Sequence, residues 1–117
     1  MMTNPIQIDE LLERVSGNRE FVVRMLDLFF QSSDERLSTL GKEFDNRNYK
    51  ELAEQAHKLK GLVGNLSINK ALIILKKLHQ AAGLKNDLLI ISLLTELGET
   101  ITEAKIFYYK NPTLNLT

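Results

Sequence analysis

Residues 19–46 of the 117-residue chain read REFVVRMLDLFFQSSDERLSTLGKEFDN, and their apolar pattern indicates the class of fold. The apolar side chains of this stretch recur with a period close to 3.6 residues, and the stripe is broadened at its start. The stripe consists of Phe21, Val22, Met25, Leu26, Leu28, Phe29, Leu37, Leu40 and Phe44. The pattern predicts a long amphipathic helix, from about Arg19 to Asn46, which must bury one face against other helices.

Helical periodicity continues on both sides of this stretch, and no strand pattern competes with it. A short helix is expected before it, from about Ile8 to Val15. Three helices are expected after it, at about Tyr49 to Leu66, Asn69 to Ala82, and from Asn86 or Asp87 to Tyr109.

Residue types that end or cap helices separate these segments. Ser16, Gly17 and Asn18 break the first helix. Asn48 and Glu51 have the spacing of a capping box, and either Asn86 or Asp87 can cap the last helix. Gly83 is expected to adopt a left-handed conformation that ends the fourth helix.

The two prolines, Pro5 and Pro112, lie near the ends of the chain. Long amphipathic helices with short connections favour antiparallel neighbours. We therefore predict an all-α fold, an antiparallel up-down four-helix bundle with a short extra N-terminal helix. The chain is expected to be one domain, residues 1–117, with its core at about 6–109 and a tail at 110–117.

Composition limits the possible functions. Lys and Arg balance Asp and Glu at 15 each, which argues against a general nucleic-acid binder. The chain has no cysteine, which excludes disulfides and thiol chemistry. Neither a signal peptide nor a membrane span is visible, so we expect a soluble, cytoplasmic protein.

The helix predicted at residues 49–66 carries the chemistry. Its segment 56–66 reads AHKLKGLVGNL. At about 100° per residue, Lys60, Gly61 and Gly64 lie on the same stripe as His57. The opposite side carries the apolar residues that must enter the core, namely Leu52, Ala56, Leu59, Val63 and Leu66. His57 is therefore predicted to point away from the core.

The two glycines on the His57 stripe are unusual, because each costs a helix interior about 1 kcal/mol relative to alanine. They lie off the predicted core face, and the small size of glycine allows another backbone to approach closely. Lys60 places a cation one turn from His57, where it can neutralise phosphate oxygens. The pattern predicts an exposed nucleophilic imidazole beside a bare surface for a partner.

A metal site is a weaker interpretation of the same helix. Glu54 and His57 have the Glu-x-x-His spacing of di-iron bundles. Such sites need a second pair, and the other histidine, His79, follows Lys76 at that spacing. His57 also faces away from the core, so we expect no metal in this chain.

With these residues in hand, the chain resembles the histidine-containing phosphotransfer (HPt) domain of two-component phosphorelays. The family motif matches the run from His57 to Gly64. The opening helix and turn at residues 11–20, and the polar–aromatic lead-in at 46–49, are also similar. The resemblance covers roughly residues 6–109.

The resemblance implies a phosphohistidine carrier rather than a stand-alone enzyme. His57 would take a phosphoryl group from an aspartyl phosphate of a receiver domain and pass it to another receiver. The expected partners are response-regulator receivers and a hybrid sensor histidine kinase. Mg²⁺ would come from the receiver, and no cofactor is expected in this chain. Because no ATP-binding motif is visible, we expect no kinase activity of its own. We expect the chain to be a monomer. The docking surface is expected to comprise Lys58, Gly61, Leu62, Gly64 and Asn65.

Two positions depart from the family pattern. Ser67 stands where many members have glycine. His79, followed by Gln80, stands where many have a Gln or Glu that orients the active imidazole. The resemblance therefore leaves either His79 or Gln80 as the orienting residue.

Two other functions compete with the relay. A helical bundle of this kind could be a scaffold without relay activity, although the intact set of His57, Lys60, Gly61 and Gly64 argues against this. A dimerisation domain of a histidine kinase would typically have an acidic residue after the histidine and a proline nearby. Here Lys58 follows His57, and no proline is close.

Overall fold

The computed structural model describes residues 4–111, which contain five helices and no strand. The helices are α1 (Ile8–Arg14), α2 (Arg19–Asp45), α3 (Tyr49–Asn65), α4 (Asn69–Gly83) and α5 (Asp87–Lys110). The all-α prediction with five helices is confirmed, and each helix ends within one residue of its predicted end. The predicted tail lies outside the described residues from position 112 onward.

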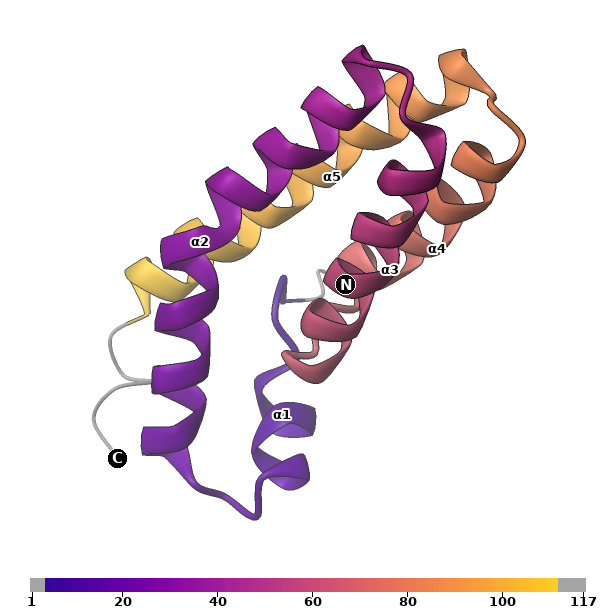
Figure 1. Cartoon of the computed structure of the whole chain (residues 1–117). Coiled ribbons are helices and arrows are strands. Elements are labelled where there is room, and N and C mark those ends of the chain that lie inside the picture. Colours follow the sequence, from indigo (N-terminus) through magenta and orange to yellow (C-terminus); the bar gives the residue numbers. More distant parts are fainter. Residues whose placement is uncertain (1–3, 112–117) are drawn as a thin grey trace.

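The four longer helices pack around one apolar core. Helix α3 packs extensively against α4, and α4 packs against α5. Helix α2 contacts both α3 and α5, so each of the four helices packs against two of the others (Figure 1). None of the described helices is long and apolar enough to cross a membrane.

The apolar face predicted for α3 is the face that enters the core. Leu52, Ala56 and Val63 are completely buried, and Leu59 and Leu66 nearly so. From α2 the core takes Val22, Leu26, Phe29, Phe30, Leu40 and Phe44. Removing these side chains from water is the main force that holds the helices together.

The four connections between helices share one turn geometry. In each connection the residue after the C-cap of the preceding helix is in the left-handed conformation, and these residues are Ser16, Arg47, Ser67 and Lys85. After α3, for example, the Ser67 amide donates to the Gly64 carbonyl, and the Ile68 amide donates to the Val63 carbonyl. This pair of hydrogen bonds defines a Schellman motif, which satisfies the last carbonyls of the helix.

These turns correct two expectations about caps. Gly83 lies within α4, and Lys85 adopts the left-handed conformation instead. Asn48 is the N-cap of α3, but its side chain accepts no capping hydrogen bond. The Asn48 amide already donates to the Glu43 carbonyl in the preceding turn, so it has no free hydrogen for Glu51 to accept. Of the two candidates at α5, Asn86 is the cap, accepting from the Leu89 amide.

Helix α1 is attached to the turn between α3 and α4. Arg14 donates to the carbonyls of Gly64 and Asn65 at 2.7 and 2.9 Å. Glu10 pairs with Arg14 and accepts hydrogen bonds from Ser67 and Asn69. The two Arg14 hydrogen bonds satisfy the carbonyls of Gly64 and Asn65 at the C-terminus of α3. They also place a cation at the negative end of the α3 helix dipole.

Candidate functional site: an exposed histidine on α3

His57 lies on the solvent-exposed side of α3, opposite the buried residues Ala56, Leu59 and Val63. The orientation expected from the helical pattern is therefore the one observed. An open hollow lies beside His57 and is lined by Glu54, His57, Lys58 and His79.

The aromatic ring of His79, on α4, lies beside the ring of His57. The two ring centroids are 5.9 Å apart, and the planes are tilted by 51°. The Nδ1 atom of His79 lies 3.1 Å from the carbonyl oxygen of Ala53, one turn before His57 on α3. Because a carbonyl oxygen can only accept, His79 donates its Nδ1 hydrogen in this contact.

The two expected orienting residues differ in position. His79 shares the hollow with His57, whereas Gln80 is exposed and does not line it. No hydrogen bond joins either side chain to His57 among residues 4–111. The structure thus brings His79, and not Gln80, beside the imidazole.

The two lysines on α3 occupy different surroundings. Lys58 lines the His57 hollow, and Lys60 is half-buried outside it. Neither ammonium group forms an ion pair with a carboxylate in the described part of the chain. Both charges are therefore available to an incoming anion.

The two glycines on the stripe also differ. A β-carbon at Gly61 would meet nothing within 4 Å, so this position is an open surface. At Gly64 a β-carbon would lie 3.6 Å from Leu72 of α4, in ordinary van der Waals contact. Gly64 is half-buried, and its carbonyl accepts from Arg14. Gly61 is thus the bare position beside His57, while Gly64 lies against α4 and near α1.

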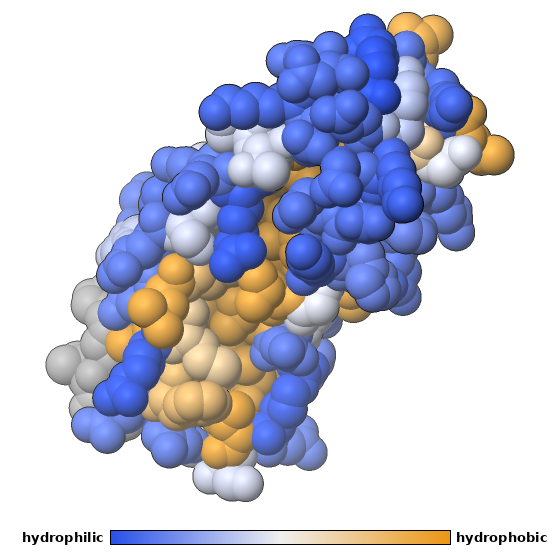
Figure 2. Space-filling view, in the orientation of Figure 1, coloured by the Kyte–Doolittle hydropathy of each residue, from blue (hydrophilic) through white to orange (hydrophobic). Residues whose placement is uncertain are grey.

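An apolar hollow of about 250 Å³ lies between α2 and α3. It includes Leu62 and Asn65, both expected to contact a partner, and Leu66, which is otherwise buried. Figure 2 shows apolar side chains gathered in this region between the two helices. The hollow therefore adds an apolar surface along the edge of α3 that faces α2.

Helix α2 supplies the other wall of this hollow, which the sequence analysis missed. Its lining residues are Met25, Leu28, Phe29, Ser32 and Arg36. Leu28 is 61% exposed although it belongs to the apolar stripe. The broadening of that stripe at its start was the signal that could have identified this surface, because a core face alone needs a narrower stripe.

No three His, Asp or Glu side chains within residues 4–111 are grouped so that they could hold a metal ion. Glu54 and His57 share the same hollow, but no further carboxylate lines it. The hollow thus combines the exposed His57 imidazole with a second imidazole, one ammonium group and one carboxylate.

The comparison with protein families assigns this arrangement to a class. The family model described as Hpt domain matches residues 24–103, which include His57, His79 and most of the bundle. The chain belongs to the Hpt domain family, the histidine phosphotransfer domains of two-component phosphorelays. Searches of curated proteins and of solved structures gave no significant match.

Proposed function

We propose that His57 is the residue that carries the phosphoryl group, accepting it from an aspartyl phosphate of one receiver domain and passing it to an aspartate of another. The observation that supports this most is the exposure of His57 on α3, beside the bare position Gly61 and within the family match.

The proposed transfer needs one bond to form and one to break. A ring nitrogen of His57 attacks phosphorus, and the bond between phosphorus and the aspartyl oxygen breaks, which releases the carboxylate. Negative charge is carried by the phosphoryl oxygens throughout the transfer. Lys60, one turn from His57 on α3, is the proposed cation for these oxygens, and Lys58 adds positive charge in the His57 hollow.

We propose His79, rather than Gln80, as the residue that positions His57. Donation of the Nδ1 hydrogen to Ala53 leaves the Nε2 atom of neutral His79 with a lone pair. That lone pair can accept a hydrogen bond from the His57 ring through one bridging water, at the ring separation observed. Holding one nitrogen of His57 in this way would leave the other free to attack phosphorus.

The partner surface is proposed to include Lys58, Gly61, Leu62, Gly64 and Asn65, with receiver domains and a hybrid sensor kinase as partners. The receiver would supply Mg²⁺, and this chain would lack kinase activity of its own. We also propose that the four long helices run in antiparallel up-down order. The chain is further proposed to be a cytoplasmic monomer.

The test is transfer from a purified receiver domain that has been phosphorylated beforehand. Wild-type chain should acquire acid-labile, base-stable phosphate, and His57→Gln should acquire none. His79→Gln should retain transfer, because glutamine can also accept a hydrogen bond, whereas His79→Leu should slow it about tenfold or more.

Label that persists in His57→Gln would refute the assignment of the phosphorylated residue. Equal rates for His79→Leu and wild type would remove His79 from the mechanism. A receiver that binds the chain tightly yet transfers no phosphate would instead support the scaffold function.

A further inference from the structure

We propose that Arg36 of α2 is a specificity-determining residue that binds a carboxylate on the docked receiver domain. The inference rests on the proposed function, because it concerns the partner that covers His57. It adds the chemistry of that partner: an apolar protrusion flanked by an acidic side chain.

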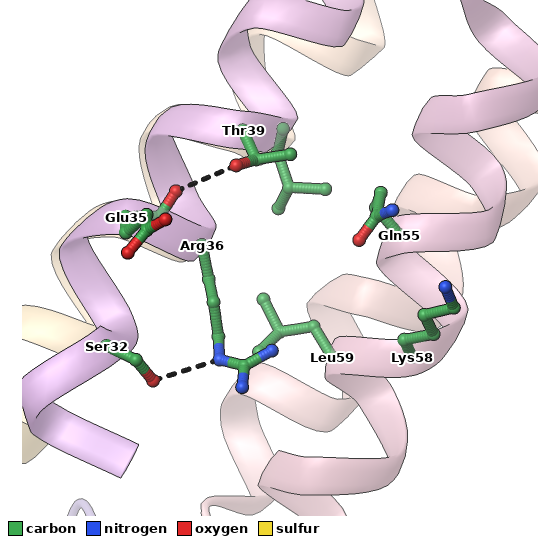
Figure 3. A pocket seen from close by; sticks show the side chains of 8 residues that line it. Ser32, Glu35, Arg36, Thr39, Gln55, Lys58 and Leu59 are labelled. Carbon is green, nitrogen blue, oxygen red and sulfur yellow. Dashed lines mark hydrogen bonds between the residues drawn. The ribbon is translucent and has the colours of Figure 1, made fainter. Parts of the chain in front are cut away.

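Arg36 lies where two hollows between α2 and α3 meet. One is the apolar hollow beside Leu28 and Leu62. The other is a polar hollow of about 270 Å³, which also includes Gln55 and Lys58. Figure 3 shows the Arg36 side chain extending from α2 across the space toward Leu59 of α3.

The position of the guanidinium group is set by one hydrogen bond. The Nε atom of Arg36 donates to the hydroxyl oxygen of Ser32, one turn earlier on α2, at 3.1 Å (Figure 3). Within residues 4–111 the guanidinium makes no ion pair. Arg36 is exposed, and within residues 4–111 its two terminal nitrogens donate no hydrogen bond, so both can donate to a partner's carboxylate. The two adjoining hollows are called the groove.

The groove is placed so that a protein bound at His57 would cover it. Lys58 lines both the His57 hollow and the polar hollow that contains Arg36. Leu62 lies about one turn beyond His57 on the side of α3 that faces α2. A partner spanning these residues would contact Arg36 at the same time.

Charge complementarity determines the chemistry of that partner. The groove has two cations, Arg36 and Lys58, and one carboxylate, Glu35, which pairs with neither of them. An acidic side chain over Arg36 would be favoured, and a basic one would be repelled. The adjoining apolar hollow, which also contains Arg36, accepts an aliphatic or aromatic side chain of the same partner.

The experiment measures the affinity of the chain for a purified receiver domain selected because it phosphorylates the wild type. Arg36→Gln should weaken binding about fivefold to tenfold, and Arg36→Glu should weaken it further. Arg24→Gln is the matched control, since Arg24 is an exposed arginine on the same helix that lines a different hollow. It should stay within twofold of wild type.

A receiver variant completes the test, in which the acidic residue that contacts Arg36 is replaced by lysine. This receiver variant should bind wild-type chain more weakly, and it should restore binding to Arg36→Glu. If both Arg36 variants are folded in thermal melts and bind with unchanged affinity, the inference is overturned. Phosphorylation of the wild type in the same experiment would leave the proposed function of His57 standing. Equal losses for Arg24→Gln and Arg36→Gln would overturn it too, because they would indicate general electrostatic attraction. Self-association of the chain through the groove, abolished by Leu28→Asp, would identify a second copy as the occupant instead.

Discussion

The two glycines near His57 have the same side chain but different surroundings. Gly61 faces open space, whereas Gly64 faces Leu72 and is attached to α1 through its carbonyl. The helical pattern placed both on the His57 stripe, and it could not separate them, because the position of α4 relative to α3 is a tertiary property. Gly61 is therefore the better probe of a partner's approach.

Gly61→Ala should raise the free energy of unfolding by about 1 kcal/mol, because alanine favours a helix interior and the site is open. Chemical denaturation measures this gain. Gly61→Leu should keep wild-type stability or better but lower the rate of phosphoryl transfer from a receiver, since its side chain occupies the approach to His57. Transfer at the wild-type rate in Gly61→Leu would contradict a close approach at this position.

At the scale of elements, the turns control how the helices meet. Each connection has a left-handed residue other than glycine at the position where glycine is the usual signal. Only the connection between α1 and α2, among residues 4–111, also contains a left-handed glycine, Gly17, and the sequence marked that break. Ser67 shows why such a residue can serve: its backbone is left-handed, and its buried hydroxyl donates to Glu10 of α1. A glycine at this position would adopt the turn but lose that contact.

Arg14→Ala should destabilise the domain by about 1 kcal/mol, since the carbonyls of Gly64 and Asn65 lose a charged donor that is partly exposed to solvent. A thermal melt should show a decrease of about 4 °C. Arg14→Lys should recover only part of the loss, because lysine lacks the planar fork that donates to two carbonyls. Arg24→Ala is the control, and a loss as large as that of Arg14→Ala would contradict a specific role for the α1 contact.

At the scale of the whole molecule, a buried tyrosine joins α5 to α2. Tyr108 of α5 packs on Phe30 of α2, with ring centroids 5.5 Å apart. Its hydroxyl donates to Asp27 at 2.6 Å. Burial, and then the hydrogen bond to Asp27, raise the pKa of Tyr108 well above its usual value.

A raised pKa in the folded state makes stability depend on alkaline pH. The unfolded chain releases the Tyr108 proton near pH 10, while the folded chain retains it. The contribution of Tyr108 is therefore complete below pH 10 and is lost as the pH rises beyond it. The free energy of unfolding, measured by urea denaturation, should decrease by about 1 kcal/mol between pH 9 and pH 11.

The variants Tyr108→Phe and Tyr109→Phe separate this effect from general alkaline denaturation. Tyr108→Phe should be less stable at pH 8, since Asp27 loses a hydrogen bond, but its stability should fall less between pH 9 and 11. Tyr109 is exposed, so Tyr109→Phe should keep the wild-type pH dependence. Identical slopes in all three proteins would show that another group titrates.

The helices, and the side of α3 on which His57 lies, can be predicted from the sequence. Both follow from the spacing of apolar residues, because a 3.6-residue period and a face that must leave water are local properties of the chain. The neighbours of these residues on other helices come from the packing alone. The packing brings His79 rather than Gln80 to the His57 ring, separates Gly61 from Gly64, and places Leu28 and Arg36 of α2 in one hollow with Leu62 of α3. These relations depend on how one helix is rotated and shifted against another, and no spacing within a single helix specifies that.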